Sequence, residues 1–100
     1  MAVANFSAYI TSKEALNKFT ECLSTETTPH SVFVFAISPG PVRTAMSESL
    51  LNSPEGMKWL PWFKDVFEQR SVPPERAADL VLEIAAGEHD EKSGQLISAV

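Results

Sequence analysis

A tyrosine and a lysine four residues apart are the side chains whose types and spacing could do chemistry. Tyr9 and Lys13 lie in the stretch Ser-Ala-Tyr-Ile-Thr-Ser-Lys, which begins at Ser7. On a helix this spacing puts both side chains on one face. An ammonium close to a phenol stabilises the phenolate, which suits general acid/base catalysis. The chain has one tyrosine and five lysines, and such a pair alone is more often an ordinary surface contact than a catalytic one.

A second candidate site is the turn Pro-Gly-Pro-Val-Arg-Thr, which covers residues 39–44 and follows an apolar run. Ligands of open α/β sheets bind outside the carboxyl ends of the strands. Gly40 allows a close backbone approach, while Val42 and Thr44 offer an N–H and a hydroxyl to a flat polar ligand. A structural turn is the alternative, because Pro-Gly pairs mark turns in general. Arg43 fits either a phosphate contact or, as we favour, an ordinary surface position.

The tyrosine and the lysine are expected on a long helix. The apolar residues Leu16, Phe19 and Leu23 recur at helical spacing and predict a helix over 7–27. Because the apolar stripe is broad, we expect this helix to be buried on more than one side. Cys22 lies close to the stripe and is expected to be a buried, unreactive thiol.

The start of this helix has two candidate signals. Ser7 is a suitable N-cap, and Thr11 with Glu14 could form a capping box one turn later. Pro29 follows the predicted end, because the residue before a proline disfavours the α region.

The rest of the chain predicts a parallel pair of strands. The unbroken apolar run 32–37 is typical of a strand covered on both faces, and 95–100 predicts a last strand. A helix over 74–86 separates them, which favours a right-handed crossover. Between these elements, 42–72 reads as irregular apart from a short helix over 44–51. Two parallel strands do not make a self-sufficient sheet, so the pattern indicates the last portion of a larger doubly wound α/β domain.

Together the two motifs resemble the short-chain dehydrogenase/reductase family. In that family a Tyr-x-x-x-Lys pair lies on the helix before the sixth strand, and Pro-Gly-x-Val-x-Thr follows that strand. The resemblance covers nearly the whole chain. It implies that residues 1–100 form the C-terminal part of a Rossmann-type parallel sheet, incomplete as a domain.

The resemblance also implies a role for each matching residue. Tyr9 matches the catalytic acid/base, and Lys13 matches the catalytic lysine that hydrogen-bonds the nicotinamide ribose. The cofactor is NAD or NADP, with no preference readable, and the substrate is a small carbonyl or alcohol. The implied cofactor-binding residues are Tyr9, Lys13, Pro39, Gly40, Val42 and Thr44.

The segment 41–72 matches the family's variable substrate loop, most closely over 45–72. Its apolar residues suit either an apolar substrate or a lid that covers the site. The resemblance further implies a homo-oligomer through the helix 7–27. The loop residues in question are Trp59, Leu60, Trp62 and Phe63.

Several parts of the family's catalytic apparatus have no match in these 100 residues. The glycine-rich turn after the first strand, the Asn-Ala-Gly segment and the catalytic serine are missing from the sequence. Without the glycine turn no helix N-terminus holds the cofactor diphosphate. We therefore expect the isolated chain to be inactive as a dehydrogenase. The alternative is a non-catalytic fragment that acts by association or has no function.

Composition excludes several other classes of function. The formal net charge of −5 argues against nucleic-acid binding. No apolar run reaches the roughly 20 residues of a membrane helix, and residues 1–6 do not resemble a signal peptide. With a single cysteine, these features favour a cytoplasmic location. His30 and His89 lack metal-ligand spacing, so no metal is expected.

Overall fold

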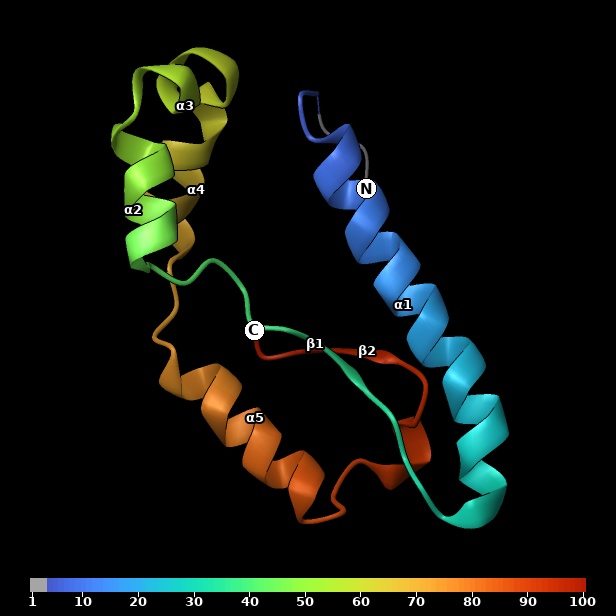
Figure 1. The fold of residues 1–100 in the computed structure, drawn as a ribbon. Helices are drawn as coiled ribbons and strands as arrows, with labels where there is room; N and C mark the ends of the chain where they lie inside the picture. Colours follow the sequence, from blue (N-terminus) through green and yellow to red (C-terminus); the bar gives the residue numbers. More distant parts are fainter. Residues whose placement is uncertain (1–3) are drawn as a thin grey trace.

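The chain alternates helices with two short strands, and the structure, a computed structural model, describes residues 4–100. Residues 1–3, part of the segment in which we expect no signal peptide, lie outside the described residues. Figure 1 shows α1 on one side of the strands and α5 on the other. In order, the elements are α1 (Ser7–Thr27), a 3₁₀ turn (Thr28–His30), β1 (Ala36–Ser38), α2 (Ala45–Asn52), α3 (Pro54–Trp59), α4 (Pro61–Arg70), α5 (Glu75–Ala85), a second 3₁₀ turn (Asp90–Lys92) and β2 (Leu96–Ser98).

The predicted parallel pairing of the two strands is confirmed. β1 and β2 run parallel with Ala36 opposite Leu96 and Ser38 opposite Ser98. The Ala36 N–H donates to the Gln95 carbonyl at 3.2 Å, and α5 provides the connection between the strands. Each strand has only three residues, so the predicted lengths were wrong. Before Ala36 there is no strand pairing, and isolated hydrogen bonds hold the chain. The Val34 N–H, for example, donates to the Ser93 hydroxyl.

The most buried residues of α1 are polar, contrary to the prediction that its apolar stripe would be buried. Thr20 and Ser24 are buried, whereas Leu16 and Phe19 are 52% and 60% exposed. Cys22 is also exposed, so the expected burial of its thiol was wrong. Leu23 is half-buried, so the predicted burial of the stripe is found only in part.

Small residues make the approach of α1 to the strands possible. Gly94, with φ +89°, lies so close to Ser24 that a Cβ there would overlap the Ser24 hydroxyl. The buried hydroxyls are satisfied within the helix, because Thr20 donates to the Leu16 carbonyl and Ser24 to the Glu21 carbonyl. Burying them therefore leaves neither hydroxyl without a partner.

The helix α1 spans the predicted residues but starts differently from the prediction. Phe6 occupies the N-cap position, and no side chain caps the helix. Neither Ser7 nor the Thr11–Glu14 pair acts as a cap, so both predicted start signals were wrong. The start of α1 must be held by other contacts.

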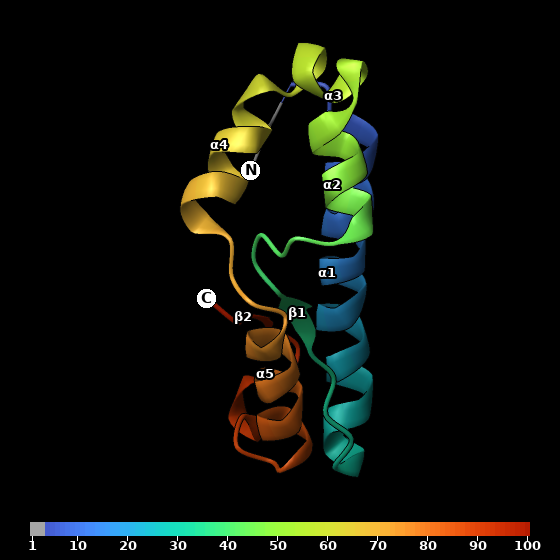
Figure 2. The same cartoon turned by 90° about the vertical axis from the view of Figure 1, so that its left-hand side faces the viewer.

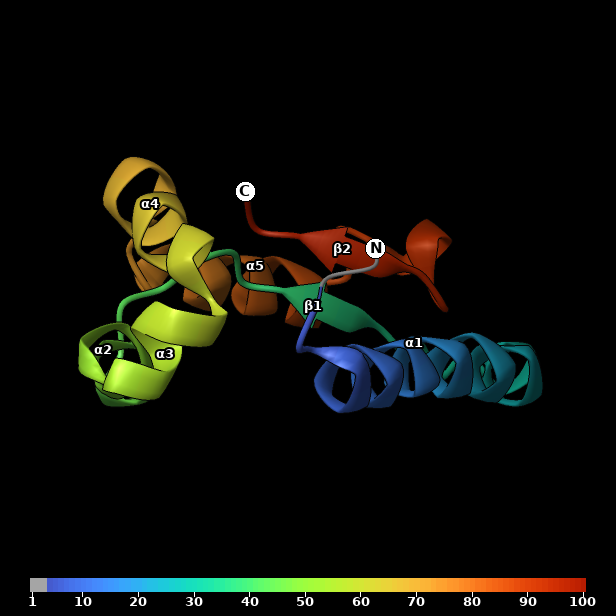
Figure 3. The ribbon, with the colours of Figure 1, turned by 90° about the horizontal axis from the view of Figure 1, so that it is seen from above.

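The segment 41–72 is mostly helical, so its description as irregular was wrong beyond the short helix predicted at 44–51. Thr44 and Ser47 form a capping box at the start of α2. Ser53 accepts a hydrogen bond from the Gly56 N–H at 2.9 Å at the start of α3. Figure 3 shows α2, α3 and α4 gathered on the side opposite α1. The Val72 N–H donates to the Pro41 carbonyl at 2.9 Å, which joins the two ends of the segment 41–72.

The molecule is elongated, with α1 running along most of its length (Figure 2). Its extents are 49 × 27 × 18 Å and its radius of gyration is 15.9 Å, compared with about 13 Å for a compact chain of 100 residues. It exposes 7037 Å², whereas a folded 11.0 kDa monomer exposes about 5,600 Å². The buried apolar residues are Leu51, Leu60, Phe67 and Leu80, and three of these lie in the segment 41–72.

Over residues 4–100, no helix combines the length and the apolar character needed to cross a membrane.

Replacing Gly94 with alanine should destabilise the fold through two additive effects. The positive φ costs about 1–2 kcal/mol for a residue with a Cβ, and the overlap with Ser24 adds about 1–3 kcal/mol. Gly87→Ala is the matched control, because its φ is +84° but a Cβ there meets Asp90 only at 3.4 Å. Urea unfolding followed by circular dichroism measures both. Equal losses for the two variants would contradict the close approach of α1.

Candidate functional site

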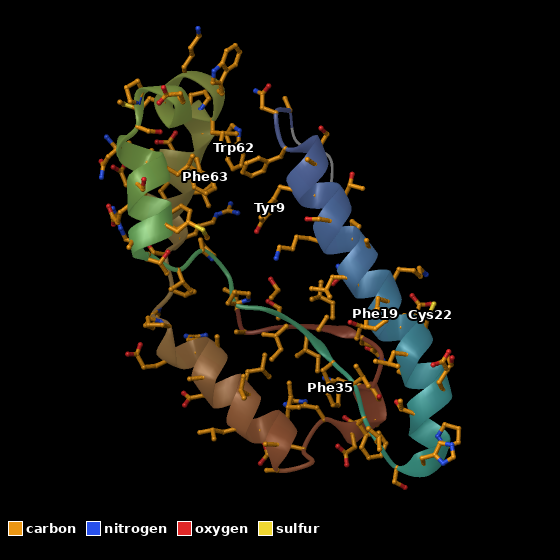
Figure 4. The ribbon with its side chains drawn as sticks, in the orientation of Figure 1. Tyr9, Phe19, Cys22, Phe35, Trp62 and Phe63 are labelled. Atoms are coloured by element: carbon orange, nitrogen blue, oxygen red, sulfur yellow. The ribbon has the colours of Figure 1, made fainter. Side chains whose placement is uncertain are left out.

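Tyr9 and Lys13 lie on one face of α1, as their spacing predicts. The Lys13 Nζ is 5.5 Å from the centroid of the Tyr9 ring. Figure 4 shows the Tyr9 side chain pointing from the upper part of α1 into the space toward α4. Tyr9 is 55% exposed and lies at the surface beside the cleft described next.

The two side chains border an open cleft of about 580 Å³ between α1 and the carboxyl end of β1. Pro39 lines the same cleft, so the structure brings together three of the residues proposed to bind the cofactor. The cleft lies where ligands of open parallel sheets are held. Its other lining residues are Leu16, Asn17, Thr20, Phe35, Ala36, Ile37, Ser38 and Leu96.

Gly40, Val42 and Thr44 are not among the residues that line this cleft. Gly40 has φ +81°, and a Cβ there would lie 2.5 Å from the Val100 side chain, so this position requires glycine. The Val42 carbonyl accepts a hydrogen bond from the Ser47 hydroxyl at 3.3 Å. The cofactor roles of all three residues stay predictions.

The Thr44 hydroxyl has a structural task that sequence reasoning missed. It accepts a hydrogen bond from the Ser47 N–H at 3.3 Å, and the Ser47 hydroxyl accepts one from the Thr44 N–H at 2.8 Å. The sequence signal for this capping box is a threonine followed three residues later by a serine, just before the apolar residues of α2.

Arg43 pairs with a carboxylate at the surface, in agreement with the surface position we favoured. Its Nε lies 2.5 Å from Oε1 of Glu48. The hydrogen bond from Arg43 lowers the pKa of Glu48 below its ordinary value and raises that of the guanidinium.

The four residues of the predicted substrate loop are divided between two environments. Leu60 is buried and lines a small cavity of about 110 Å³ between α2, α3 and α4. Trp59 is exposed, with Lys58 Nζ 4.8 Å above its ring. Only Trp62 and Phe63 reach toward α1 (Figure 4).

Trp62 and Phe63 meet the start of α1 through an aromatic residue that the sequence argument did not single out. The centroid of Phe6 lies 6.1 Å from that of Trp62 and 6.2 Å from that of Phe63. It also lies 5.3 Å from the centroid of Tyr9. Each such pair contributes ~0.5–1.5 kcal/mol beyond the area it buries. The available signal was an aromatic residue three positions before Tyr9, one helical turn away.

One group of metal-ligating side chains meets within the part of the chain that the structure describes. Ligand atoms of Glu83, Glu88 and His89 lie within 4.8 Å of one another. The sequence argument weighed only the two histidines and missed the carboxylates beside one of them. His89 Nε2 lies 3.5 Å from Glu83 Oε2. Both carboxylates are exposed to solvent, where acidic groups commonly cluster without an ion, so no metal site is proposed here.

The Arg43–Glu48 pair predicts a pH dependence. Because the pKa of Glu48 is lowered in the folded chain, the pair stabilises the fold above the ordinary carboxyl pKa. That contribution disappears as the pH falls through the lowered pKa. Carboxyl ¹³C titration by NMR should show the Glu48 midpoint rising in Arg43→Gln. An unchanged midpoint in this variant would show that the arginine is not the cause.

Comparisons with known proteins agree with this arrangement. A family model described as short chain dehydrogenase matches residues 1–55. A short-chain dehydrogenase/reductase of Armillaria gallica is 33% identical over 96 residues, which cover 93% of this chain and 37% of the relative. An uncharacterized oxidoreductase of Schizosaccharomyces pombe is 32% identical over 88 residues, or 88% of this chain and 34% of the relative.

A solved structure has the same fold over most of this chain. The crystal structure of a short chain dehydrogenase from Mycobacterium paratuberculosis bound to NAD matches with a TM-score of 0.72 and 26% identity, covering 90% of this chain and 35% of that one. The chain thus spans about a third of the length of these relatives. Its two parallel strands and their helices correspond to part of that protein's fold. Since the family model matches more than half of the residues, this chain belongs to the short chain dehydrogenase family.

Proposed function

We propose that this chain carries the acid/base part of an NAD(P)-dependent oxidoreductase that interconverts a carbonyl and an alcohol. The observation that carries the proposal is the placement of Tyr9 and Lys13 on one face of α1, at the open cleft beside the carboxyl end of β1. Both polar groups reach solvent there, and the cleft is wide enough for a small substrate next to a flat ring.

Tyr9 has the central role in the proposed chemistry. In reduction its hydroxyl donates a proton to the substrate carbonyl oxygen, and in oxidation its phenolate takes the proton of the alcohol. The Lys13 ammonium stabilises the phenolate and donates a hydrogen bond to the ribose next to the nicotinamide. When bound, NAD(P) supplies or accepts the hydride.

The residues present fit the nicotinamide end of the cofactor better than its diphosphate end. Tyr9, Lys13 and Pro39 line a cleft open enough for a nicotinamide and its ribose. The four glycines of the chain, at 40, 56, 87 and 94, are too widely spaced for a glycine-rich phosphate turn. Turnover therefore requires polypeptide that supplies this turn, and we expect the 100 residues alone to be inactive.

The surroundings of Tyr9 favour an apolar substrate. Phe6 packs against the Tyr9 ring, and Trp62 is next to Phe6 on the same side. A carbonyl compound whose carbonyl oxygen faces the Tyr9 hydroxyl has aromatic surface beside it. The alternative, an aromatic lid without substrate contact, predicts no preference for apolar substituents.

The proposal is tested in a chimera in which residues 4–100 replace the matching third of the Mycobacterium paratuberculosis protein. The chimera should oxidise NADH or NADPH with a panel of apolar ketones and aldehydes. Tyr9→Phe should lower kcat by about 10²–10⁴-fold, because that range is typical of losing a general acid. Phe33→Ala, which lies outside the cleft lining, serves as the control. A folded chimera whose turnover does not depend on Tyr9 would refute the proposed role.

A second proposed function is association with a further copy of this chain through the exposed stripe of α1. Leu16 and Phe19 are more than half exposed, and exposed apolar patches mark interaction sites. The chain also exposes more surface than a compact monomer of its mass. This proposal covers the non-catalytic alternative as well as a homo-oligomeric enzyme.

Sedimentation of the chain should show a concentration-dependent dimer at tens of micromolar. Phe19→Glu should shift the chain to monomer, because a charge then lies on the apolar stripe. Met46→Glu is the matched control, since Met46 is 81% exposed on α2 away from that stripe. A chain that stays monomeric at every concentration, or two variants with the same effect, would exclude association through α1.

A further inference from the structure

Phe6 joins the candidate acid/base to the helix that carries the aromatic residues of the segment 41–72. Its contacts with Trp62 and Phe63 are both edge-to-face, with interplanar angles of 87° and 82°. Its contact with Tyr9 is tilted by 38°. Edge-to-face packing favours particular ring orientations more than simple burial does. One half-buried ring thus touches both the phenol and the α4 side of the site.

The neighbouring contacts anchor this arrangement at both ends. The Asn5 side-chain amide donates to the Trp59 carbonyl at 3.0 Å, next to the point where α3 gives way to α4. Within α4, Phe63 packs against Phe67 at 4.8 Å, and Phe67 is buried. The start of α1 has no side-chain cap, and these contacts from Asn5 and Phe6 connect it to α3 and α4. The α4 helix is fixed to its own group of helices through Phe67.

We propose that Phe6 is a positioning residue that keeps the phenol of Tyr9 and the aromatic face of α4 in a single arrangement. This inference rests on the proposed role of Tyr9 as proton donor. If α4 moves, the ring of Phe6 moves with it, and the orientation of the Tyr9 ring changes. The segment 41–72 therefore acts on the reaction through Phe6, in addition to any contact that it makes with the substrate.

Fluorescence of the whole chain tests the coupling without requiring activity. In a Trp59→Phe background, Trp62 is the one tryptophan and Tyr9 the one tyrosine, so energy transfer between them reports their separation and orientation. Phe6→Ala should reduce this transfer at least twofold and move the Trp62 emission to longer wavelength. Phe33→Ala is the control, because Phe33 takes no part in these aromatic contacts and should leave both signals unchanged.

Phe6→Leu separates the ring from its bulk. Leucine keeps most of the apolar volume but removes the edge-to-face contacts. We therefore expect an energy-transfer efficiency between that of the wild type and that of Phe6→Ala. Full wild-type transfer in Phe6→Leu would overturn the proposal, as would an unchanged signal in Phe6→Ala or an equal loss in Phe33→Ala. If Phe6→Ala loses helical circular dichroism, Phe6→Leu alone decides.

Kinetics of the chimera provide a second readout that a purely structural role would not produce. Phe6→Ala should lower kcat about tenfold while leaving the KM for the nicotinamide cofactor unchanged, because the phenol is misplaced but the cofactor wall is intact. An unchanged kcat would contradict positioning. A chimera that is inactive even with Tyr9 intact refutes the proposed function, whereas the fluorescence result still decides whether Phe6 couples α4 to Tyr9.

Discussion

The close approach of α1 to the two strands is the constraint on which the rest of the structure depends. It is possible because Ser24 and Thr20 are small and bond their hydroxyls within the helix, and because Gly94 has no Cβ. A larger residue at any of these positions would push the helix away from β2. A backbone hydrogen bond next to the paired strands supports the same contact, since the Gly94 N–H donates to the Val34 carbonyl at 2.7 Å.

The candidate site follows from this packing. With Thr20 and Ser24 against the strands, α1 carries Lys13 and Tyr9 to the carboxyl end of β1, where the cleft opens. The helix continues past the strands far enough for Phe6 to meet α4. Leu16 and Phe19 stay more than half exposed in the same orientation. Leu16 also lines the cleft, whereas Phe19 lies outside its lining, so the proposed acid/base site and the proposed association surface adjoin on one helix.

Sequence reasoning found the elements that local patterns determine. The bounds of α1 and the parallel crossover were predictable, because a long periodic helix and an apolar run are strong signals. The helices α3 and α4 were missed because each contains a proline, Pro54 or Pro61, and proline inside a helix usually breaks it. Both prolines occupy the first helical position, where proline costs nothing because its missing N–H would have no partner there.

Other features depend on tertiary packing and could not be predicted from spacing. The exposure of Leu16 and Phe19 was not predictable, because helical spacing shows which residues share a face but not which elements cover that face. The Tyr9–Lys13 pair was predictable because four residues of helix fix it. Its neighbour Phe6 was not, because its partners on α4 lie more than fifty residues along the chain.

The orientation of α1 is tested most directly by thiol reactivity at two positions on opposite sides of the helix. Native Cys22 is exposed, whereas residue 24 is buried against Gly94. At low micromolar protein, Cys22 should react with a neutral maleimide almost as fast as in the urea-unfolded chain. In a Cys22→Ser, Ser24→Cys variant the thiol should be strongly protected. A protected Cys22 with a reactive thiol at position 24 would show that α1 turns the opposite face to the strands, and the account of the site given above would be wrong.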